Sequence, residues 1–399
     1  MKASIIIPSY NARERLFLNL TALNNQDYNS EDAEVVVVDN GSCDHTHEML
    51  QTFKLKFPLK VIRLEKNRGI ARGRNEGILN ASGDIIIFHD SDMIASRDFV
   101  TRHVEAHVND DQVVCGLFWK RIYSYYYEHF SKAQRKHFEG FCLDKGLDHS
   151  GLYDGMPLLS VDQVNCEDLM RISFDLEIPF IKDLKDILNI YGKELTGYHL
   201  PWRVFITNNL SVKRKRVVSV GLLDEHIIQY GYEDYDLGIR LYKSGCRFTV
   251  NQDIVSLHQE HPANYTYKDV IENVNYICEK YNHIYFIDMQ LVCLNEVLKA
   301  DSVEINDIMG DVYRLIAVNS HHPLLHLFLE LLQILRRRSS PSFEGIPYEV
   351  LQRIVRSIPE IIYQAKEVIK NHQGNHFVNM LCQLLKLVLN IEIEAFIRA

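Results

Sequence analysis

The stretch IIIFHDSDM, residues 85–93, decides the fold of the amino-terminal half of the chain. An unbroken apolar run of this length is typical of a strand that is buried on both faces. The run ends in Asp90 and Asp92, which are separated by one residue. Two carboxylates after a strand can chelate a hard divalent cation together with phosphate oxygens, although an isolated Asp-x-Asp is more often a solvated turn or a helix cap. The position at a strand end favours a ligand.

Three similar units precede this stretch. Apolar runs predict buried strands at 4–10, 33–42 and 59–65, and the patterns after them predict helices at 11–26, 44–57 and 70–81. Strands that alternate with helices form βαβ units and a parallel sheet. Ligands of such sheets bind beyond the carboxyl ends of the strands. The residues after Pro8, together with Asp39 and Asp90, are therefore expected near one ligand.

The chain after this sheet is less regular. The aromatic segment WKRIYSYYYEHF, residues 119–130, is interpreted as packing in a helix, with a groove for a partner as the alternative. Order returns with strand-like pieces around residues 207–209. The pattern then predicts a helix at 236–243 and one or two strands at 247–261.

Beyond Tyr265 the pattern is almost entirely helical, which predicts a separate helical module. Residues 322–338 are apolar nearly all round and end in three arginines, whereas Pro359 is expected to break or kink a helix at 348–370. A core or oligomer contact is favoured for the apolar helix over an amphipathic membrane anchor. A homo-oligomer formed through this module is one expectation, and peripheral membrane contact is another.

Composition excludes several classes of protein. The 399 residues are 46% hydrophobic and 24% charged, as in a globular protein, and the net charge of −9 argues against a nucleic-acid binder. Eight cysteines without a CxxC pair fit a reducing compartment better than a disulfide framework. The first residues do not form a signal peptide, and no apolar run reaches membrane-spanning length. A cytoplasmic location is therefore expected.

Two further clusters point towards a nucleotide. Asp39 opens the sequence DNGS, where its carboxylate can accept a hydrogen bond from a nucleobase imide or a ribose, or can belong to a simple Asn-Gly turn. Residues 67–84 are rich in glycine and arginine. Arg68, Arg72 and Arg74 can balance phosphates, although this motif taken alone favours a solvated basic helix face.

Two more clusters suggest catalysis and metal binding. Glu233 and Asp234 open a helix, where a carboxylate can act as a general base, or can simply favour the positive end of the helix dipole. His258, at the end of a predicted strand, can be a third metal ligand or a structural histidine. His261 competes for the same role, and the sequence leaves the choice between them open.

Taken in order, these pieces resemble the inverting glycosyltransferase family 2, which has the GT-A fold. The resemblance covers about residues 1–262 and is carried by SIIIPSYNARERL, VVVVDNGSCDHT, NRGIARGRNEGILNASGDIIIFHDSDM and GYEDYDLGIRL. Each motif is weak alone, but four in the same order are specific. The stretch TNNLSVKR…GLLDE…GYEDYDLGIRL is also similar to the carboxyl-terminal half of galactosyltransferase-type enzymes.

The resemblance implies an α/β catalytic domain of the GT-A type over residues 1–265, followed by the helical module at 266–399. Within the domain, residues 1–115 would bind the nucleotide sugar, 116–200 would be a variable acceptor-side insertion, and 201–265 would carry the acceptor site and the catalytic base. The resemblance also implies that Pro8, Tyr10 and Asp39 contact the nucleobase, with Asp39 on a uracil-type imide, and that Arg68 or Arg74 contacts the nucleotide. Asp90 would contact the donor and bind the metal, which Asp92 and His258 would also bind. Asp234 would be the catalytic base, Glu233 would orient hydroxyls, and Trp202 and Asn208 would contact the acceptor.

The activity that the resemblance implies is transfer of a single sugar, with inversion and with Mn²⁺ or Mg²⁺, from a nucleotide-diphosphate donor. A UDP-sugar donor and a glycan or polysaccharide precursor as acceptor are favoured, with a peptide or protein acceptor as the alternative. The QxxRW element of processive family members is absent, which favours single-sugar transfer. A nucleotidyltransferase ranks lower because PSYNARERL replaces a glycine-rich basic loop. A non-catalytic relative ranks lower because Asp90, Asp92 and Asp234 are all present.

Overall fold

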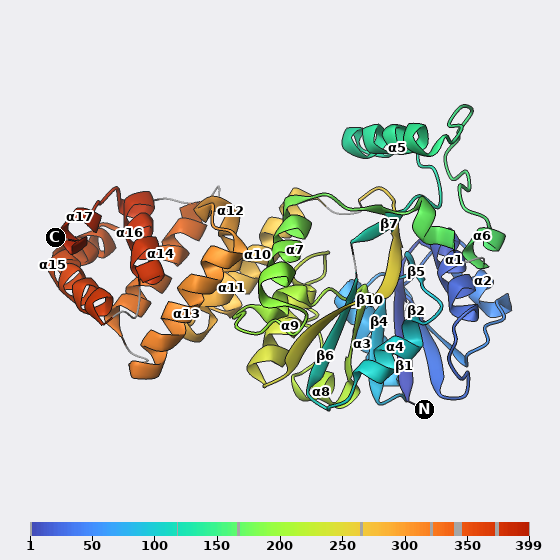
Figure 1. Ribbon diagram of the computed structural model, residues 1–399, viewed down its shortest axis with the longest axis horizontal. Helices are drawn as coiled ribbons and strands as arrows, with labels where there is room; N and C mark the ends of the chain where they lie inside the picture. The colour runs from blue at the N-terminus through green and yellow to red at the C-terminus, as the bar shows by residue number, and fades with distance from the viewer. Residues whose placement is uncertain are drawn as a thin grey trace. The chain divides into compact units, whose positions relative to one another are not determined.

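A computed structural model of the protein describes residues 2–117, 119–165, 168–263, 266–319, 322–338, 345–371 and 375–398. The chain divides into two compact units (Figure 1). The first consists of residues 1–196 and 201–270, and the second of residues 197–200 and 271–399. Each unit is described separately below.

One sheet organises the first unit. Its strands follow the order β3-β2-β1-β4-β9-β6-β10-β7-β8, and β5 pairs with β10. The strands are β1 (Ala3–Ser9), β2 (Ala33–Asp39), β3 (Leu59–Arg63), β4 (Ile85–His89), β5 (Met93–Ala95), β6 (Gln112–Leu117), β7 (Lys120–Ile122), β8 (Phe174–Asp175), β9 (Asn209–Lys213) and β10 (Arg247–Gln259). The first four strands are parallel to one another, which confirms the predicted βαβ units. β9 runs antiparallel between β4 and β6.

Each of the first three strands is followed by a helix, and β4 is followed by the loop that carries Asp90 and Asp92. The helices of this region are α1 (Arg13–Asn24), α2 (Thr46–Thr52), α3 (Ile70–Asn80) and α4 (Phe99–Ala106). Every residue of β1, β2 and β4 is buried, as expected for a sheet covered on both faces. Gly77 lets α3 approach the sheet, because a Cβ atom there would overlap Ile6. The predicted αβ fold with a mostly parallel sheet is therefore confirmed.

The aromatic segment 119–130 does not form the predicted helix. Its chain is extended because its backbone pairs with residues 155–159: Tyr126 donates to the Met156 carbonyl, and Leu158 donates to the Ser124 carbonyl. The prediction that the aromatics pack is confirmed, since Tyr123 lies against Phe130 and other rings of one cluster. The elements around this cluster are α5 (Lys132–Lys145), α6 (Val161–Asn165), the 3₁₀ helix η1 (Asp168–Ile172) and α7 (Pro179–Tyr191).

The remaining elements of the first unit are the 3₁₀ helix η2 (Pro201–Val204), α8 (Arg214–Ser219) and α9 (Glu233–Lys243). The helix predicted at 236–243 begins three residues earlier, so both Glu233 and Asp234 lie in its first turn. β10 is one strand with an irregularity between Val250 and Val255. It extends to Gln259, where it pairs with both β5 and β7.

The second unit is helical, as the sequence predicts. Its helices are α10 (Tyr267–Lys280), η3 (Ile284–Phe286), α11 (Ile287–Cys293), α12 (Asn295–Leu298), α13 (Ser302–Val318), α14 (Pro323–Arg338), α15 (Tyr348–Lys370), α16 (Asn375–Leu389) and α17 (Glu394–Arg398). α15 continues through Pro359, so the expected break is absent. Most of α14 is buried against its neighbours, in agreement with a core role for this apolar helix.

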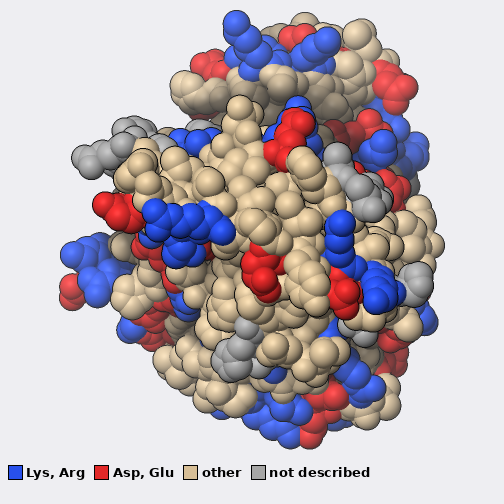
Figure 2. Space-filling view, turned by 90° about the vertical axis from the view of Figure 1, so that its left-hand side faces the viewer, with Lys and Arg blue, Asp and Glu red and all other residues tan. Residues whose placement is uncertain are grey.

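Figure 2 looks onto the helical unit, and uncharged side chains occupy much of the centre of the visible face. Exposed apolar residues of this unit include Tyr348, Tyr363 and Phe396. Within the described part of the chain, no helix combines the length and the apolar character needed to cross a membrane. Oligomerisation and peripheral membrane contact remain predictions.

Candidate active site

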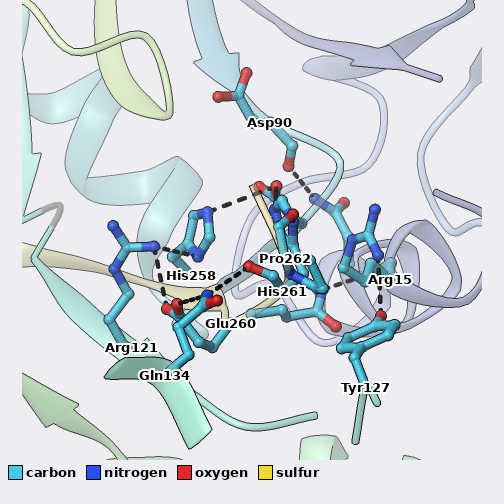
Figure 3. A network of polar contacts seen from close by, with 12 residues as sticks. Arg15, Asp90, Arg121, Tyr127, Gln134, His258, Glu260, His261 and Pro262 are labelled. Atoms are coloured by element: carbon cyan, nitrogen blue, oxygen red, sulfur yellow. Dashed lines mark hydrogen bonds and ion pairs between the residues drawn. The ribbon is translucent and has the colours of Figure 1, made fainter. Parts of the chain in front are cut away.

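Asp92, His258 and His261 meet at one end of the sheet, where β5 and β10 pair. The register places His258 opposite Met93, and the backbone N–H of Gln259 donates to the Asp92 carbonyl at 2.8 Å. The Asp92 Oδ2 atom lies 2.9 Å from His261 Nε2 and 3.6 Å from His258 Nε2. One possible ligand atom from each side chain lies within 4.8 Å of the other two (Figure 3). This cluster has the donor set of a divalent-metal site.

The two histidines differ in how their other ring nitrogen is held. His261 Nδ1 lies 2.8 Å from the Pro262 carbonyl, which can only accept, so in the neutral ring the lone pair of Nε2 faces Asp92. His258 Nδ1 lies 2.5 Å from an Arg121 nitrogen, which can only donate, so the proton of this ring belongs on Nε2. A metal binds an unprotonated nitrogen. Asp92 and His261 therefore fit a metal, whereas His258 turns a protonated Nε2 towards Asp92 Oδ2 from 3.6 Å, beyond hydrogen-bond distance.

A second observation supports the fit. The Asp92 Oδ2 atom and the His261 lone pair are two acceptors that face each other, an arrangement that needs a cation or a proton between them. Asp92 Oδ1 is buried and makes no hydrogen bond within the described chain. A carboxylate and an imidazole together suit Mn²⁺, and the carboxylate alone suits Mg²⁺. The residues present thus fit the metal that the sequence predicts.

Asp90 belongs to a different cluster from Asp92. Arg74, on α3, is fully buried and donates to Asp90 Oδ1 at 2.8 Å and to Glu233 Oε1 at 3.0 Å. The second oxygen of Glu233 accepts the backbone N–H of Gly231 at 2.8 Å. One buried guanidinium therefore joins the loop after β4 to the first turn of α9. The Asp90 side chain is turned towards Arg74, and a direct role for it as a metal ligand stays a prediction.

Asp234 follows Glu233 and is half-buried. The backbone N–H of Tyr235 donates to Asp234 Oδ1 at 2.8 Å. Burial and the neighbouring Glu233 raise the pKa of Asp234 to about 8, although Arg74 acts in the opposite direction. A carboxyl group with a raised pKa is a strong proton acceptor once it has ionised, as a general base requires.

Asp39 lies at the end of β2, where the sequence predicts contact with a nucleobase. Its side chain is fully buried at the end of β2, and its Oδ1 atom accepts the Ser42 N–H at 2.9 Å. Its Oδ2 atom makes no hydrogen bond in the described chain, and Arg63 Nε and His47 Nδ1 each lie 3.9 Å away. A buried carboxylate oxygen without a donor is costly unless a ligand supplies one. This observation fits the predicted contact with a nucleobase N–H.

The residues around Asp39 form the rest of the predicted nucleotide site. Asn40 donates to the Gly69 carbonyl at 2.9 Å and accepts the Arg68 backbone N–H at 3.0 Å, which fixes the start of α3. The Arg68 side chain is exposed, Pro8 is buried near the end of β1, and Tyr10 is 45% exposed just beyond it. These positions agree with the predicted contacts, which stay predictions.

The predicted acceptor residues differ in exposure. Trp202 is fully buried, and its ring lies edge-on against Tyr235 at 5.3 Å between centroids. It has no surface to offer an acceptor, so this structure does not support the predicted platform. Trp202 instead fills the core below α9. Asn208 is half-buried, and its Oδ1 atom lacks a hydrogen-bond partner in the described chain.

Sequence reasoning missed Arg121 and Gln134. Arg121 lies opposite His258 in the pairing of β7 with β10, and Gln134 lies at the start of α5. Arg121 belongs to no recognisable motif, and Gln134 belongs only to a capping-box pattern at 131–134, which gives no sign of a contact with His261. Only the pairing of β7 with β10, and the contact of α5 with the segment after β10, could identify them.

Fold and site together define a glycosyltransferase of the GT-A type. The family model for "Glycosyl transferase family 2" matches residues 4–156. The Bacillus subtilis (strain 168) glycosyltransferase YfnE is 44% identical over 400 residues, which cover 99% of each chain. The chain therefore belongs to glycosyltransferase family 2 and is an enzyme of the transferase class.

More distant relatives share part of the chain. Chondroitin synthase from Escherichia coli is 28% identical over 262 residues, which are 65% of this chain and 35% of that protein. The crystal structure of S. aureus TarS aligns at 16% identity with a TM-score of 0.44, over 86% of this chain and 50% of that one. At this distance the latter likeness carries no argument about the site. The likeness to galactosyltransferase-type enzymes stays a prediction.

Proposed function

We propose that this protein transfers a single sugar, with inversion and with a divalent metal, from a UDP-sugar to a hydroxyl of a glycan or polysaccharide precursor. One observation carries the proposal: buried Arg74 donates hydrogen bonds both to Asp90, in the loop that carries Asp92, and to Glu233, which adjoins Asp234. The two terminal nitrogens of one guanidinium thus join the loop that carries Asp90 and Asp92 to the helix turn that carries Asp234. The name of the chondroitin synthase relative agrees with a glycan acceptor.

On the donor side, each residue has a distinct task. Asp39 would accept the imide N–H of the uracil on its unpaired Oδ2 atom, which selects against bases that present an acceptor there. Asp92 and His261 would hold Mn²⁺ or Mg²⁺. When bound, such an ion stabilises the negative charge that develops on the diphosphate leaving group. His258, with its Nε2 atom 3.6 Å from Asp92 Oδ2, would favour the ionised form of this carboxylate.

On the acceptor side, Asp234 would remove the proton of the attacking hydroxyl. Its Oδ1 atom already accepts a backbone N–H, which leaves Oδ2 to receive this proton. Glu233, held between Arg74 and the Gly231 N–H, would orient sugar hydroxyls. Attack from the side of Asp234 and departure from the side of Asp92 invert the anomeric carbon.

The test is a panel of UDP- and GDP-sugars incubated with the full chain and Mn²⁺, with the released nucleotide identified by chromatography. We expect UDP from at least one UDP-sugar, and no release when Mn²⁺ is chelated. Release of pyrophosphate would instead show nucleotidyl transfer. Turnover of GDP-sugars alone would overturn the assignment of Asp39 to uracil.

A further inference from the structure

Gln134 connects α5 to the short segment that carries His261. Its Nε2 atom donates to the Glu260 side chain at 2.8 Å and to the His261 carbonyl at 2.9 Å (Figure 3). Gln134 lies in the region that the sequence assigns to the acceptor side, whereas His261 belongs to the metal cluster. The contact spans 127 residues of sequence. No motif predicts it.

The same side chain also caps α5. The Gln134 Oε1 atom accepts the Ser131 backbone N–H at 3.1 Å, and the backbone N–H of Gln134 donates to the Ser131 hydroxyl at 3.2 Å. These two bonds form a capping box, which needs only an acceptor at this position and is made equally well by glutamate. The two bonds from Nε2 are therefore not required for the cap. They are a separate link, and only an amide can make both the cap and the link.

His261 depends on this link because it lies beyond the last residue of β10, Gln259. Its carbonyl is held by Gln134, and its ring nitrogen by the Pro262 carbonyl. The preceding residue, Glu260, is held through its backbone N–H by the Ile122 carbonyl at 2.8 Å. Metal ligands tolerate little misplacement, and partners beyond the ligands themselves typically change metal affinity by about 10–100-fold.

We propose that Gln134 is a positioning residue for the metal site, which couples the first turn of α5 to His261. The inference rests on the proposed function, because it assumes that Asp92 and His261 bind the metal. Thermodynamic reciprocity gives a second consequence. If Gln134 places His261 for the metal, then binding of the metal must stabilise the first turn of α5.

The chain offers a matched control for this link. Gln163 forms the same capping box with Ser160 at the start of α6, with the Ser160 N–H donating at 2.9 Å and the Ser160 hydroxyl accepting at 3.2 Å. In the described part of the chain, no hydrogen bond joins Gln163 to the segment around His261. Gln163→Glu therefore makes the same chemical change in the same kind of cap without touching the metal cluster.

The experiment is a titration of the full chain with Mn²⁺, in which free Mn²⁺ is measured by electron paramagnetic resonance. We expect Gln134→Glu to weaken Mn²⁺ binding by about tenfold and Gln163→Glu to leave it unchanged. An added carboxylate attracts a cation, so its charge alone would make Mn²⁺ binding tighter. Weaker binding by Gln134→Glu would therefore reflect the lost positioning of His261. Equal dissociation constants for wild type and Gln134→Glu would overturn the inference, as would an equal loss in both variants.

Hydrogen exchange supplies a readout that a purely structural cap would not change. We expect Mn²⁺ to slow exchange of the amides in residues 132–136 in the wild type but not in Gln134→Glu. Equal protection by Mn²⁺ in both proteins would contradict the coupling. If the wild type binds no Mn²⁺, the metal role in the proposed function is overturned as well. If the wild type and Gln134→Glu bind Mn²⁺ with equal affinity, only the positioning role of Gln134 is overturned. Thermal unfolding without metal checks that both variants fold.

Discussion

Asp90 and Asp92 follow the same strand, yet they belong to opposite electrostatic environments. Burial acts to raise the pKa of Asp92, but His258, His261 and Arg15 outweigh it and lower this pKa well below its usual range. Burial raises the pKa of Asp90 to about 6, because Arg74 offsets it only in part and Asp92 adds a like charge.

The difference follows from the balance of charges in the two clusters. Around Asp92, one carboxylate faces two imidazole rings and the Arg15 guanidinium, which favour its ionised form and suit metal binding. Around Arg74, one guanidinium faces Asp90, Glu233 and Asp234. One cation only partly offsets burial and the mutual repulsion of these carboxyl groups, so the pKa values of Asp90 and Asp234 are raised. The first arrangement fits the proposed metal ligand, and the second fits the proposed base.

The largest expected effect comes from removing the base. Asp234→Asn should lower the rate of UDP release by about 10²–10⁴-fold, the usual loss when a general base is removed. UDP affinity, measured by calorimetry, should survive because the cluster around Asp92 is untouched. The control is Asp253→Asn, which changes an exposed carboxylate on β10. A turnover near that of the wild type would show that Asp234 is not the base.

Next in size is the contrast between the two histidines. His261→Ala should weaken Mn²⁺ binding by more than about 100-fold because it removes a ligand, whereas His258→Ala should cost about tenfold because it removes a partner of Asp92. Both values come from the same Mn²⁺ titration. The reverse order would mean that Arg121 leaves His258 when the metal binds, and that His258 is the ligand.

The pH dependence separates the two clusters in the unaltered protein. Asp234 acts as a base only after losing its proton, and its pKa is about 8. The rate at low donor concentration should therefore rise by about tenfold between pH 7 and pH 9 with Mg²⁺ present. Asp92 is ionised throughout this range, so it should add no step of its own. A flat profile would exclude Asp234 as the titrating base.

The smallest expected effect concerns His89, which lies next to Asp90 but belongs to neither cluster. Its ring packs 4.8 Å from that of Phe99, and burial lowers its pKa to about 3 from an ordinary 6.5. A depressed pKa means that its contribution to stability is complete above pH 6.5 and declines as the pH falls towards 3, because only the unfolded chain takes up the proton.

Removing this imidazole should therefore reduce acid sensitivity. Between pH 6.5 and pH 5.5, we expect the free energy of unfolding of His89→Leu to fall by about 1 kcal/mol less than that of the wild type. Urea unfolding at the two pH values measures the difference, and Mn²⁺ binding at neutral pH should be unchanged. His103, with a pKa lowered to about 3, provides a second buried imidazole for comparison. Parallel pH dependences for His89→Leu and wild type would contradict the assignment.

Much of the first unit was predictable because its signals are local. Buried parallel strands appear as continuous apolar runs, and the strand ends that carry Asp39 and Asp90 follow from them directly. The helix predicted at 119–130 was wrong because hydrogen bonds to residues 155–159 hold that backbone extended. Trp202 was predicted to contact the acceptor, whereas it is buried, and an aromatic residue gives no local sign of its burial.

The sequence by itself determined the alternating α/β pattern, the helical character of the second unit and the residue types available for metal binding and proton transfer. These properties depend on periodicity and composition, which are local. The tertiary structure decided which of these residues meet: Arg74 with Asp90 and Glu233, Arg121 with His258, and Gln134 with His261. Those contacts depend on strand order and register across more than a hundred residues. They set the hydrogen-bond partners and the charges that distinguish the carboxylate proposed to bind a metal from the proposed base.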